Sequence, residues 1–290
     1  MTRQMNARLS DGAHVGGVRL QVTNLERSVA FYRDLLGFVL LRRDGSEAQL
    51  GVPAGGRTLI ALVERPVASA LPPRSRLGLF HFAILLPDRA SLGSVMLHLH
   101  EQGVRLGMSD HLVSEALYLN DPDGLGIEIY RDRPKAEWRH DGTELAMATD
   151  PLDAEGLARE PGVGPWTGMP AGTTIGHMHL HVGDLVSAEA FYSDAIGFDV
   201  MVRRYPGALF MSAGGYHHHL GANTWARGAE ASVPDEPQLL YWELMLRDAR
   251  ELAEVSARIT ESGGATTADG DNAAVARDPS GTAVRLVAEA

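Results

Sequence analysis

Hydrophobic and polar residues alternate one by one along residues 175–182, whose sequence is IGHMHLHV. A period of two is typical of a β-strand whose two faces meet different surroundings. The pattern places His177, His179 and His181 on one face of this strand and the apolar side chains on the other. Neutral imidazole is the commonest metal ligand in proteins, and a row of imidazoles is unusual in a hydrophobic core. We therefore expect this strand to contribute to a metal site.

The segments of each half of the chain follow a recurring order of one strand, one helix and three strands. Asn24 is a favourable N-cap for the first helix, predicted over residues 25–36, and Gly37 suits the left-handed conformation that ends a helix. A second helix is predicted over residues 89–102 and ends in the same way at Gly103. Strands of the first two units are predicted at residues 15–23, 39–43, 48–52, 58–63, 77–86, 105–106, 115–119 and 126–131. Each unit is therefore predicted to be βαβββ.

The second half of the chain repeats the first. The sequence AFY at residues 30–32 returns at residues 190–192, an offset of 160 residues, and LGF at 36–38 returns as IGF at 196–198. A repeat of this regularity indicates a duplicated module that consists of two units. The organisation we predict is a flexible tail (1–13), a first module (14–132), an inter-module connection (133–173) and a second module (174–290). The connection is rich in proline, and one short helix is expected near residues 153–159.

Composition and charge exclude several classes of protein. The chain of 290 residues contains no cysteine, which rules out disulfides, thiolate ligands and a cysteine nucleophile. Its net charge of -11 argues against a nucleic-acid or anionic-membrane partner, because both bind basic surfaces. We find neither an apolar run long enough to span a membrane nor a secretory signal, and we expect a cytoplasmic protein. A homo-oligomer is compatible with this composition.

Several segments resemble the vicinal-oxygen-chelate superfamily, which includes glyoxalase I, bleomycin-resistance proteins and extradiol dioxygenases. They are LERSVAFYRDLLGF in the first helix, FHFAILLPDR, SEALYLNDPDG, the strand ending GIEIY, and SAGGYHHH. The resemblance covers nearly the whole chain outside the tail and the connection. It implies an α+β fold of four βαβββ units paired into two half-open barrels, with a divalent metal held by the first and last strands.

The residues at the family's ligand positions are uneven. First-strand positions carry Gly17, His81, His177 and Tyr241 in units one to four, and last-strand positions of the even units carry Glu128 and Arg285. His81, Glu128 and His177 are the suitable ligands, and they meet only if units two and three share one barrel. Two imidazoles and one carboxylate match the facial triad of non-haem Fe(II), and Mn(II) is the alternative metal. A buried His81 without a metal, as an ordinary core residue, is the competing interpretation.

The resemblance also implies residues that act on a substrate. The extradiol enzymes carry an acid–base histidine in the segment that resembles residues 210–221, and the match points to His218, with His217 beside it. We expect residues 215–220 to form a strand, in which His217 and His218 would face opposite ways. His111 and Tyr118 occupy the positions of a histidine and a tyrosine near the substrate oxygens. His179 and His181 are expected to be wall or surface residues, and a purely structural histidine cluster is the competing interpretation of the HHH run.

The function implied is extradiol cleavage of catechol or a substituted catechol, so that the partners are a small aromatic diol and O2. A glyoxalase-type isomerase or transferase is a rival, but it would usually need a second carboxylate within residues 214–223, which contain no Asp or Glu. A hydroquinone-cleaving dioxygenase and a non-catalytic binding protein of the same fold are two further rivals. A binding protein would have no reason to keep His81, Glu128 and His177 together.

Overall fold

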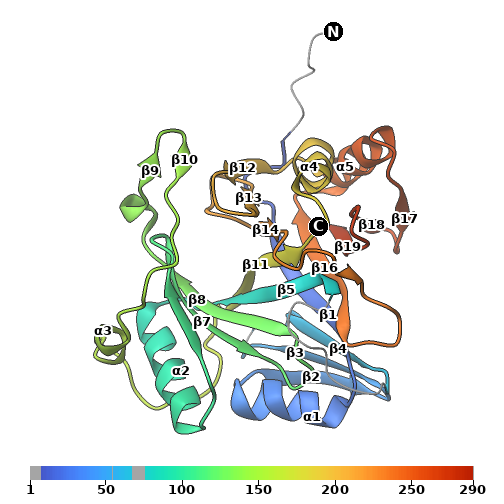
Figure 1. The fold of residues 1–290 in the computed structure, drawn as a ribbon. Helices are drawn as coiled ribbons and strands as arrows, with labels where there is room; N and C mark the ends of the chain where they lie inside the picture. The colour runs from blue at the N-terminus through green and yellow to red at the C-terminus, as the bar shows by residue number, and fades with distance from the viewer. Residues whose placement is uncertain (1–7, 54, 67–75, 290) are drawn as a thin grey trace.

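The computed structural model describes residues 8–53, 55–66 and 76–289, which form four βαβββ units (Figure 1). Unit one contains β1 (His14–Val22), α1 (Leu25–Ala30), β2 (Val39–Asp44), β3 (Glu47–Gly51) and β4 (Ile60–Glu64). Unit two contains β5 (Arg76–Leu85), α2 (Arg89–Glu101), β6 (Gly107–Asp110), β7 (Ser114–Asn120) and β8 (Gly126–Asp132). Unit three contains β11 (Thr174–His181), α4 (Leu185–Glu189), β12 (Asp199–Val202), β13 (Ala208–Ser212) and β14 (Leu220–Asn223). Unit four contains β16 (Gln238–Leu246), α5 (Ala249–Glu261), β17 (Thr266–Ala268), β18 (Ala273–Arg277) and β19 (Ala283–Ala288).

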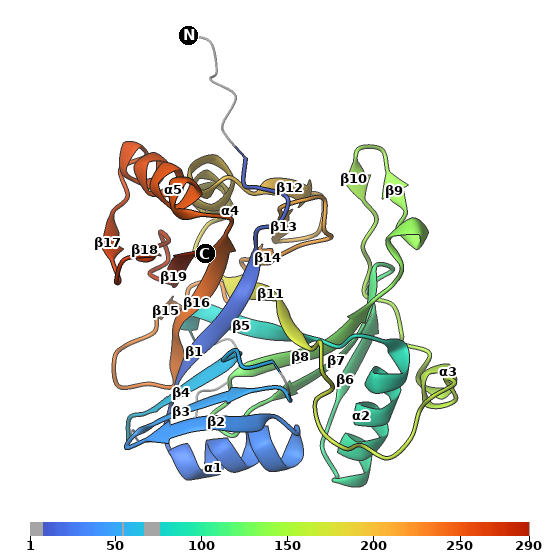
Figure 2. The ribbon, with the colours of Figure 1, turned by 180° about the vertical axis from the view of Figure 1, so that it is seen from behind.

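The four units pair crosswise into two curved sheets. One sheet has the strand order β17-β18-β19-β16-β1-β4-β3-β2, so units one and four share it. The other has the order β12-β13-β14-β11-β5-β8-β7-β6 and joins units two and three. The first strands make both junctions, β1 with β16 and β5 with β11, each antiparallel (Figure 2). This confirms the predicted α+β fold of four βαβββ units in two half-open barrels, and it also confirms that units two and three share one barrel.

A buried tyrosine in the first helical segment of each module ties two units together. In unit one, α1 continues into a π-helical turn, Phe31–Leu35, so the predicted single helix over 25–36 is two consecutive helical types. The fully buried Tyr32 donates a hydrogen bond to Asp121 in the β7–β8 turn of unit two. Tyr192 of unit three does the same to Asp278 of unit four. Each tyrosine therefore packs in the core and spans the boundary between two units of one module.

The segment 213–219 differs from the prediction. The sequence predicts a strand over residues 215–220, but the structure has a connection between β13 and β14, and β14 begins only at Leu220. Gly214 and Gly215 both have a positive φ, at 61° and 65°, in the left-handed region that regular strand backbone does not adopt. Because the backbone turns here, the alternation of a strand does not decide where the three histidines point.

The inter-module connection has more structure than its sequence indicates. Residues 133–173 contain the predicted short helix, α3 (Ala154–Ala158), together with a 3-10 turn (Lys135–Glu137) and a small hairpin of β9 (His140–Asp141) and β10 (Glu144–Leu145). A further short strand, β15 (Glu230–Ala231), pairs with β5. Figure 1 shows the hairpin projecting away from the sheet, beyond the ends of β7 and β8.

The sequence predicts a flexible tail over residues 1–13, of which residues 1–7 lie outside the described residues. From Arg8 onward the segment is held against unit three. Arg8 donates hydrogen bonds to the carbonyl oxygens of Ser193 and Phe198, and the Leu9 amide donates to Gly197. Residues 8–13 are therefore packed against the second module rather than forming a free tail.

Candidate metal centre

Three adjacent strands bring the three predicted ligands together. The strand β5 carries His81 and lies between β11, which carries His177, and β8, which carries Glu128. Ala83 is the register partner of both Glu128 and His177. Its small side chain is fully buried and leaves room for the larger groups on either side. Crosswise pairing of the units is thus what assembles the site.

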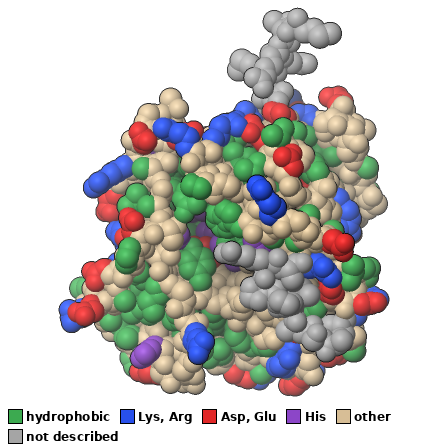
Figure 3. Space-filling view, in the orientation of Figure 1, with side chains coloured by type: hydrophobic (Ala, Val, Ile, Leu, Met, Phe, Trp, Pro, Cys, Tyr) green, Lys and Arg blue, Asp and Glu red, His purple; other side chains and the backbone are tan. Residues whose placement is uncertain are grey.

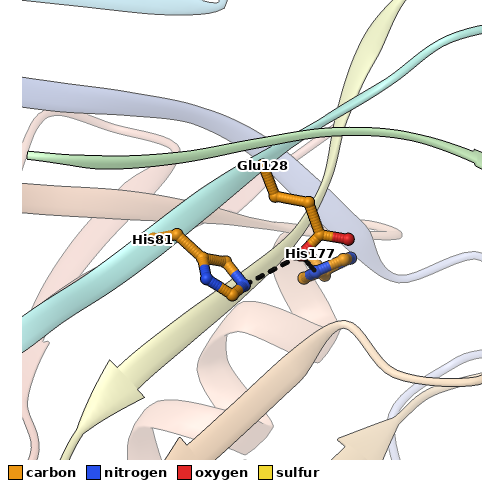
Figure 4. A group of neighbouring side chains, drawn as sticks. All are labelled: His81, Glu128 and His177. Atoms are coloured by element: carbon orange, nitrogen blue, oxygen red, sulfur yellow. Dashed lines mark hydrogen bonds and ion pairs between the residues drawn. The ribbon is translucent and has the colours of Figure 1, made fainter. Parts of the chain in front are cut away.

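The ligand atoms converge on one point (Figure 4). One carboxylate oxygen of Glu128, Oε2, lies 3.0 Å from His81 Nε2 and 3.1 Å from His177 Nε2. One ligand atom of each residue lies within 4.8 Å of the others, and all three residues are buried. Among the described residues this is the one cluster of histidine, aspartate or glutamate side chains whose geometry would hold a metal ion.

The electrostatics of the cluster favour a bound cation. Burial alone would raise the pKa of Glu128, but the imidazoles of His177 and His81 outweigh it and hold that pKa well below its usual value. Burial lowers the pKa of His177 to about 4, so its imidazole is neutral at pH 7. Glu128 is therefore ionised, and a buried carboxylate is costly unless a positive charge compensates it.

The same atoms fit a divalent ion as a donor set. Although His81 Nε2 is close to the carboxylate, it makes no hydrogen bond within the described part of the chain, so no hydrogen bond competes with a cation for this nitrogen. Two nitrogen ligands and one oxygen ligand on one side of a site suit Fe(II) and Mn(II), and they leave coordination positions open. The residues present therefore fit a metal cofactor.

A cavity of about 270 Å³ opens onto the cluster. Figure 3 shows histidine side chains in a hollow that is flanked by hydrophobic ones. The predicted residues His81, Glu128, His111, Tyr118 and His218 all line this cavity. Its other walls are mostly aromatic or apolar and come from three parts of the chain, namely Phe80, Met147, Ala148, Thr149, His179, Tyr205, Phe210 and Trp225, together with Ser109.

His111 and Tyr118 form a hydrogen-bonded pair at the wall. His111 Nδ1 lies 2.7 Å from the carbonyl oxygen of Ala148, which can only accept, so Nδ1 carries a proton. In a neutral ring Nε2 then accepts from the hydroxyl of Tyr118, 2.6 Å away. Burial, with the charge of Glu128 nearby, raises the pKa of Tyr118 well above its ordinary value. Tyr118 is therefore a neutral hydrogen-bond donor.

The histidines of the β13–β14 connection point in different directions. The ring of His218 lies 4.1 Å from that of His177, between their centroids, and faces the cavity. His217 lies behind it, with no exposed surface and outside the cavity lining. Burial lowers the pKa of His218 well below the usual histidine value, which keeps the ring uncharged at pH 7. The structure thus brings His218 to the cavity and keeps His217 in the layer behind it.

The aromatic and connection residues of the cavity are not found by sequence reasoning. Met147, Ala148 and Thr149 belong to the connection, and the Thr149 hydroxyl lies 2.6 Å from that of Tyr205. No spacing or motif distinguishes these residues, because they meet only after the connection folds over the barrel. His179, which the sequence places at the wall, lies there, with Nε2 buried and unpartnered within the described residues.

The barrel of units one and four has no such ligands at the equivalent positions of its described residues and contains an ion pair instead. At the positions equivalent to the metal cluster it has Gly17, Tyr241 and Arg285. Arg285 donates a hydrogen bond of 2.9 Å to Glu243, its register partner on the neighbouring strand, and also contacts Asp269. A guanidinium tied to the chain therefore provides positive charge in this barrel.

Two half-open barrels of βαβββ units, one of them holding a buried His–Glu–His cluster, define a metal-binding member of the vicinal-oxygen-chelate fold. The chain belongs to the Glyoxalase/Bleomycin resistance protein/Dioxygenase superfamily, because the model of that family matches residues 13–129 and 174–286. It is 46% identical over 259 residues to the catechol-2,3-dioxygenase of Bacillus subtilis (strain 168), across 88% of this chain and 90% of that protein.

Solved structures show the same fold at lower identity. A putative dioxygenase from Bacillus subtilis superposes with a TM-score of 0.65 at 14% identity, over 97% of this chain and 86% of that one. Glyoxalase I from Zea mays superposes with a TM-score of 0.59 at 19% identity, over 96% of this chain and 92% of that one. These two likenesses establish the architecture.

Within the described residues, no helix has both the length and the apolar character needed to cross a bilayer.

Proposed function

We propose that this chain is an extradiol dioxygenase that uses O2 to open catechol or a substituted catechol to a 2-hydroxymuconic-semialdehyde-type product. The observation that carries the proposal is the His81–Glu128–His177 cluster, because His81 and Glu128 line an aromatic-walled cavity that His218 and Tyr118 also line. The name of the 46% identical relative supports the same reaction class. We propose Fe(II) as the cofactor, with Mn(II) as the alternative.

The three ligands would hold the ion on one side and leave positions open for the diol and O2. When bound, such an ion acidifies a diol hydroxyl and keeps the two reactants in contact. The imidazole of His218 faces the same cavity and can take the hydroxyl proton and later return one, as a general acid–base. The Tyr118 hydroxyl, which donates to His111 in this structure, can turn to donate instead to a diol oxygen as negative charge develops there.

The walls determine what class of substrate enters. Their flat apolar surfaces suit an aromatic ring and exclude water from the reacting atoms. These surfaces belong to Phe80, Tyr205, Phe210 and Trp225. Residues 147–149 of the connection close one side of the cavity. We propose accordingly that the modules 14–132 and 174–290 are joined by a connection, 133–173, that takes part in substrate binding.

The test begins with metal-free protein loaded with Fe(II) under anaerobic conditions. O2 uptake and the yellow product are then measured with catechol, substituted catechols and hydroquinone, and a glyoxalase assay with methylglyoxal and glutathione runs in parallel. Yellow product with one O2 consumed per catechol supports the proposal. Turnover of hydroquinone or methylglyoxal alone, or of no substrate, contradicts it.

The ligand assignment has its own test. His81→Ala, Glu128→Ala and His177→Ala should each abolish metal retention after desalting, measured by elemental analysis. His140→Ala is the matched control, because His140 is an exposed histidine on β9. Retention of stoichiometric metal by any of the three ligand variants would show that the assignment is wrong.

A further inference from the structure

An unbroken hydrogen-bonded chain runs from the end of β8 to the substrate cavity. Asp132 lies four residues after Glu128 and its Oδ1 is 2.8 Å from His217 Nε2. The other ring nitrogen of His217, Nδ1, is 2.8 Å from His218 Nδ1. The remaining nitrogen of His218, Nε2, belongs to a ring that lines the cavity. Unit two thus reaches behind the histidine segment of unit three.

The position of each proton follows from the chemistry of the first acceptor. A carboxylate can only accept, so His217 Nε2 carries a proton and donates it to Asp132. In a neutral His217 ring, Nδ1 is then an acceptor, and the proton between the two rings belongs to His218 Nδ1. His218 consequently has a bare lone pair on Nε2, which is the form that a general base needs.

Asp132 is itself held as an acceptor from a second side. The Tyr216 hydroxyl lies 3.0 Å from Asp132 Oδ2, and the Tyr130 hydroxyl lies 2.7 Å from that of Tyr216. Burial, with the charge of Asp132 close by, raises the pKa of Tyr216 well above its ordinary value, so it stays a donor. The Trp138 ring packs against His217 with centroids 5.4 Å apart. The carboxylate and His217 are therefore fixed in orientation.

We propose that Asp132 and His217 are positioning residues that fix the tautomer and orientation of His218, so that its Nε2 faces the substrate as a base. This inference rests on the proposed function, because it assigns His218 the acid–base task. No sequence pattern indicates the arrangement, since Asp132 ends a strand of one module and His217 lies in a turn of the other. His217 thereby receives a role in the layer behind the substrate rather than in contact with it.

Asp132→Asn is the sharpest variant, because it keeps the shape of the side chain while it removes the charge and replaces one acceptor oxygen by a donor nitrogen. The amide nitrogen of asparagine can donate to His217 Nε2, which reverses the direction of both hydrogen bonds and places a proton on His218 Nε2. We expect kcat to fall by about 100-fold or more, as in other histidine systems that lose their orienting carboxylate. KM and metal content should stay within about threefold.

Two further variants separate positioning from damage to the fold. Asp132→Glu keeps a carboxylate acceptor and should retain kcat within about tenfold of the wild type. Asp269→Asn removes a carboxylate from the metal-free barrel, where it pairs with Arg285, and should leave kcat unchanged. A kcat of Asp132→Asn equal to that of the wild type, or a loss that follows metal content, would overturn the proposal.

A readout apart from activity uses the full-length, metal-free protein labelled with 15N-histidine. Long-range 1H–15N spectra report which ring nitrogen is protonated in each of the 12 histidines, and a His218→Gln spectrum assigns the signals of His218. We expect a protonated Nδ1 and a bare Nε2 on His218 in the wild type. A proton on Nε2 there would overturn the inference even if Asp132→Asn failed to fold. Wild-type protein that does not cleave catechol at all would instead refute the proposed function.

Discussion

At the scale of single residues, the metal cluster depends on what surrounds a buried charge. Glu128 is an acid in an apolar strand, and burial keeps its neighbour His177 neutral at pH 7. The role of Glu128 was predictable from the sequence, because a carboxylate flanked by isoleucines is buried and needs a positive charge or hydrogen-bond donors beside it. The sequence did not make Asp132 or Ala83 predictable, since their importance comes from neighbours on other strands.

The pair of His111 and Tyr118 yields the first prediction. Tyr118→Phe removes the hydroxyl that donates to His111 and faces the cavity. Because Tyr118 is not a metal ligand, metal content should be unchanged while kcat for catechol falls by about tenfold, the equivalent of about 1.4 kcal/mol. Steady-state kinetics with O2 uptake, together with elemental analysis of the same sample, measure both quantities. An unaltered kcat would show that the hydroxyl has no part in the reaction.

At the scale of elements, regular strands were predictable and the functional turn was not. The alternation of IGHMHLHV identified β11, and the apolar run around His81 identified β5. The HHH segment also resembled a strand, but Gly214 and Gly215 turn the backbone and send three successive histidines to different places. His217 reaches Asp132, His218 faces the cavity, and His219 accepts a hydrogen bond from the Ala213 amide. Local alternation cannot report such a turn.

Gly176, one residue before the ligand His177, permits close packing within this sheet. A Cβ built at Gly176 would lie 1.8 Å from the Tyr130 hydroxyl oxygen, and the pairing of β11 with β5 is irregular between Ile175 and His177. Gly176→Ala should therefore destabilise the protein by about 1–3 kcal/mol, the usual cost of overpacking, and weaken metal binding. Urea unfolding measures the first effect and metal titration the second.

Gly12→Ala is the control for that substitution, since no atom lies within 4 Å of a Cβ built there. The double variant Gly176→Ala/Tyr130→Phe removes the atom that clashes and should recover part of the lost stability. If Gly176→Ala were as stable as the control, the close approach of Tyr130 would not be what requires glycine at this position.

The β7–β8 turn predicts a pH dependence of stability. Burial raises the pKa of Asp121 from 3.8 to about 6, while backbone amides and Tyr32 only partly oppose it. Between these two values the unfolded chain loses the proton and the folded protein keeps it, so this group makes stability fall as pH rises. The loss amounts to on the order of 3 kcal/mol and is complete above about pH 6.5.

Asp121→Asn has no charge to acquire, and its amide oxygen can still accept from the amides of the turn. Relative to the wild type, the variant should gain stability as pH rises from 4 to 6 and then keep a constant advantage. Parallel urea titrations at pH 4, 5, 6 and 7 give this difference and cancel the contributions of the other groups. A difference that does not vary with pH would mean that Asp121 ionises normally in the folded protein.

At the scale of the whole molecule, the crosswise pairing decides where chemistry takes place. The repeat alone is compatible with either pairing of the four units. What distinguished them in the sequence was complementary loss, because Gly17 and Arg285 cannot replace a histidine and a glutamate. The structure adds the counterpart of that loss, the Arg285–Glu243 pair in the second barrel. One barrel thus contains a cluster that fits a metal ion, whereas the other contains an arginine side chain paired with two carboxylates.

Because the ligands come from both halves of the chain, metal binding should stabilise the association of the two modules. His81 and Glu128 belong to the first half and His177 to the second, and the β5–β11 junction lies directly beside them. An ion that binds the folded protein but not the unfolded chain raises the free energy of unfolding by RT ln(1 + [L]/Kd). This is about 2.7 kcal/mol when the free ion concentration is one hundred times Kd. Thermal unfolding of the wild type should therefore shift upward as Fe(II) is added under anaerobic conditions. His177→Ala should show no such shift, although it retains both ligands of the first half, and an equal shift in this variant would mean that the ion does not connect the two halves.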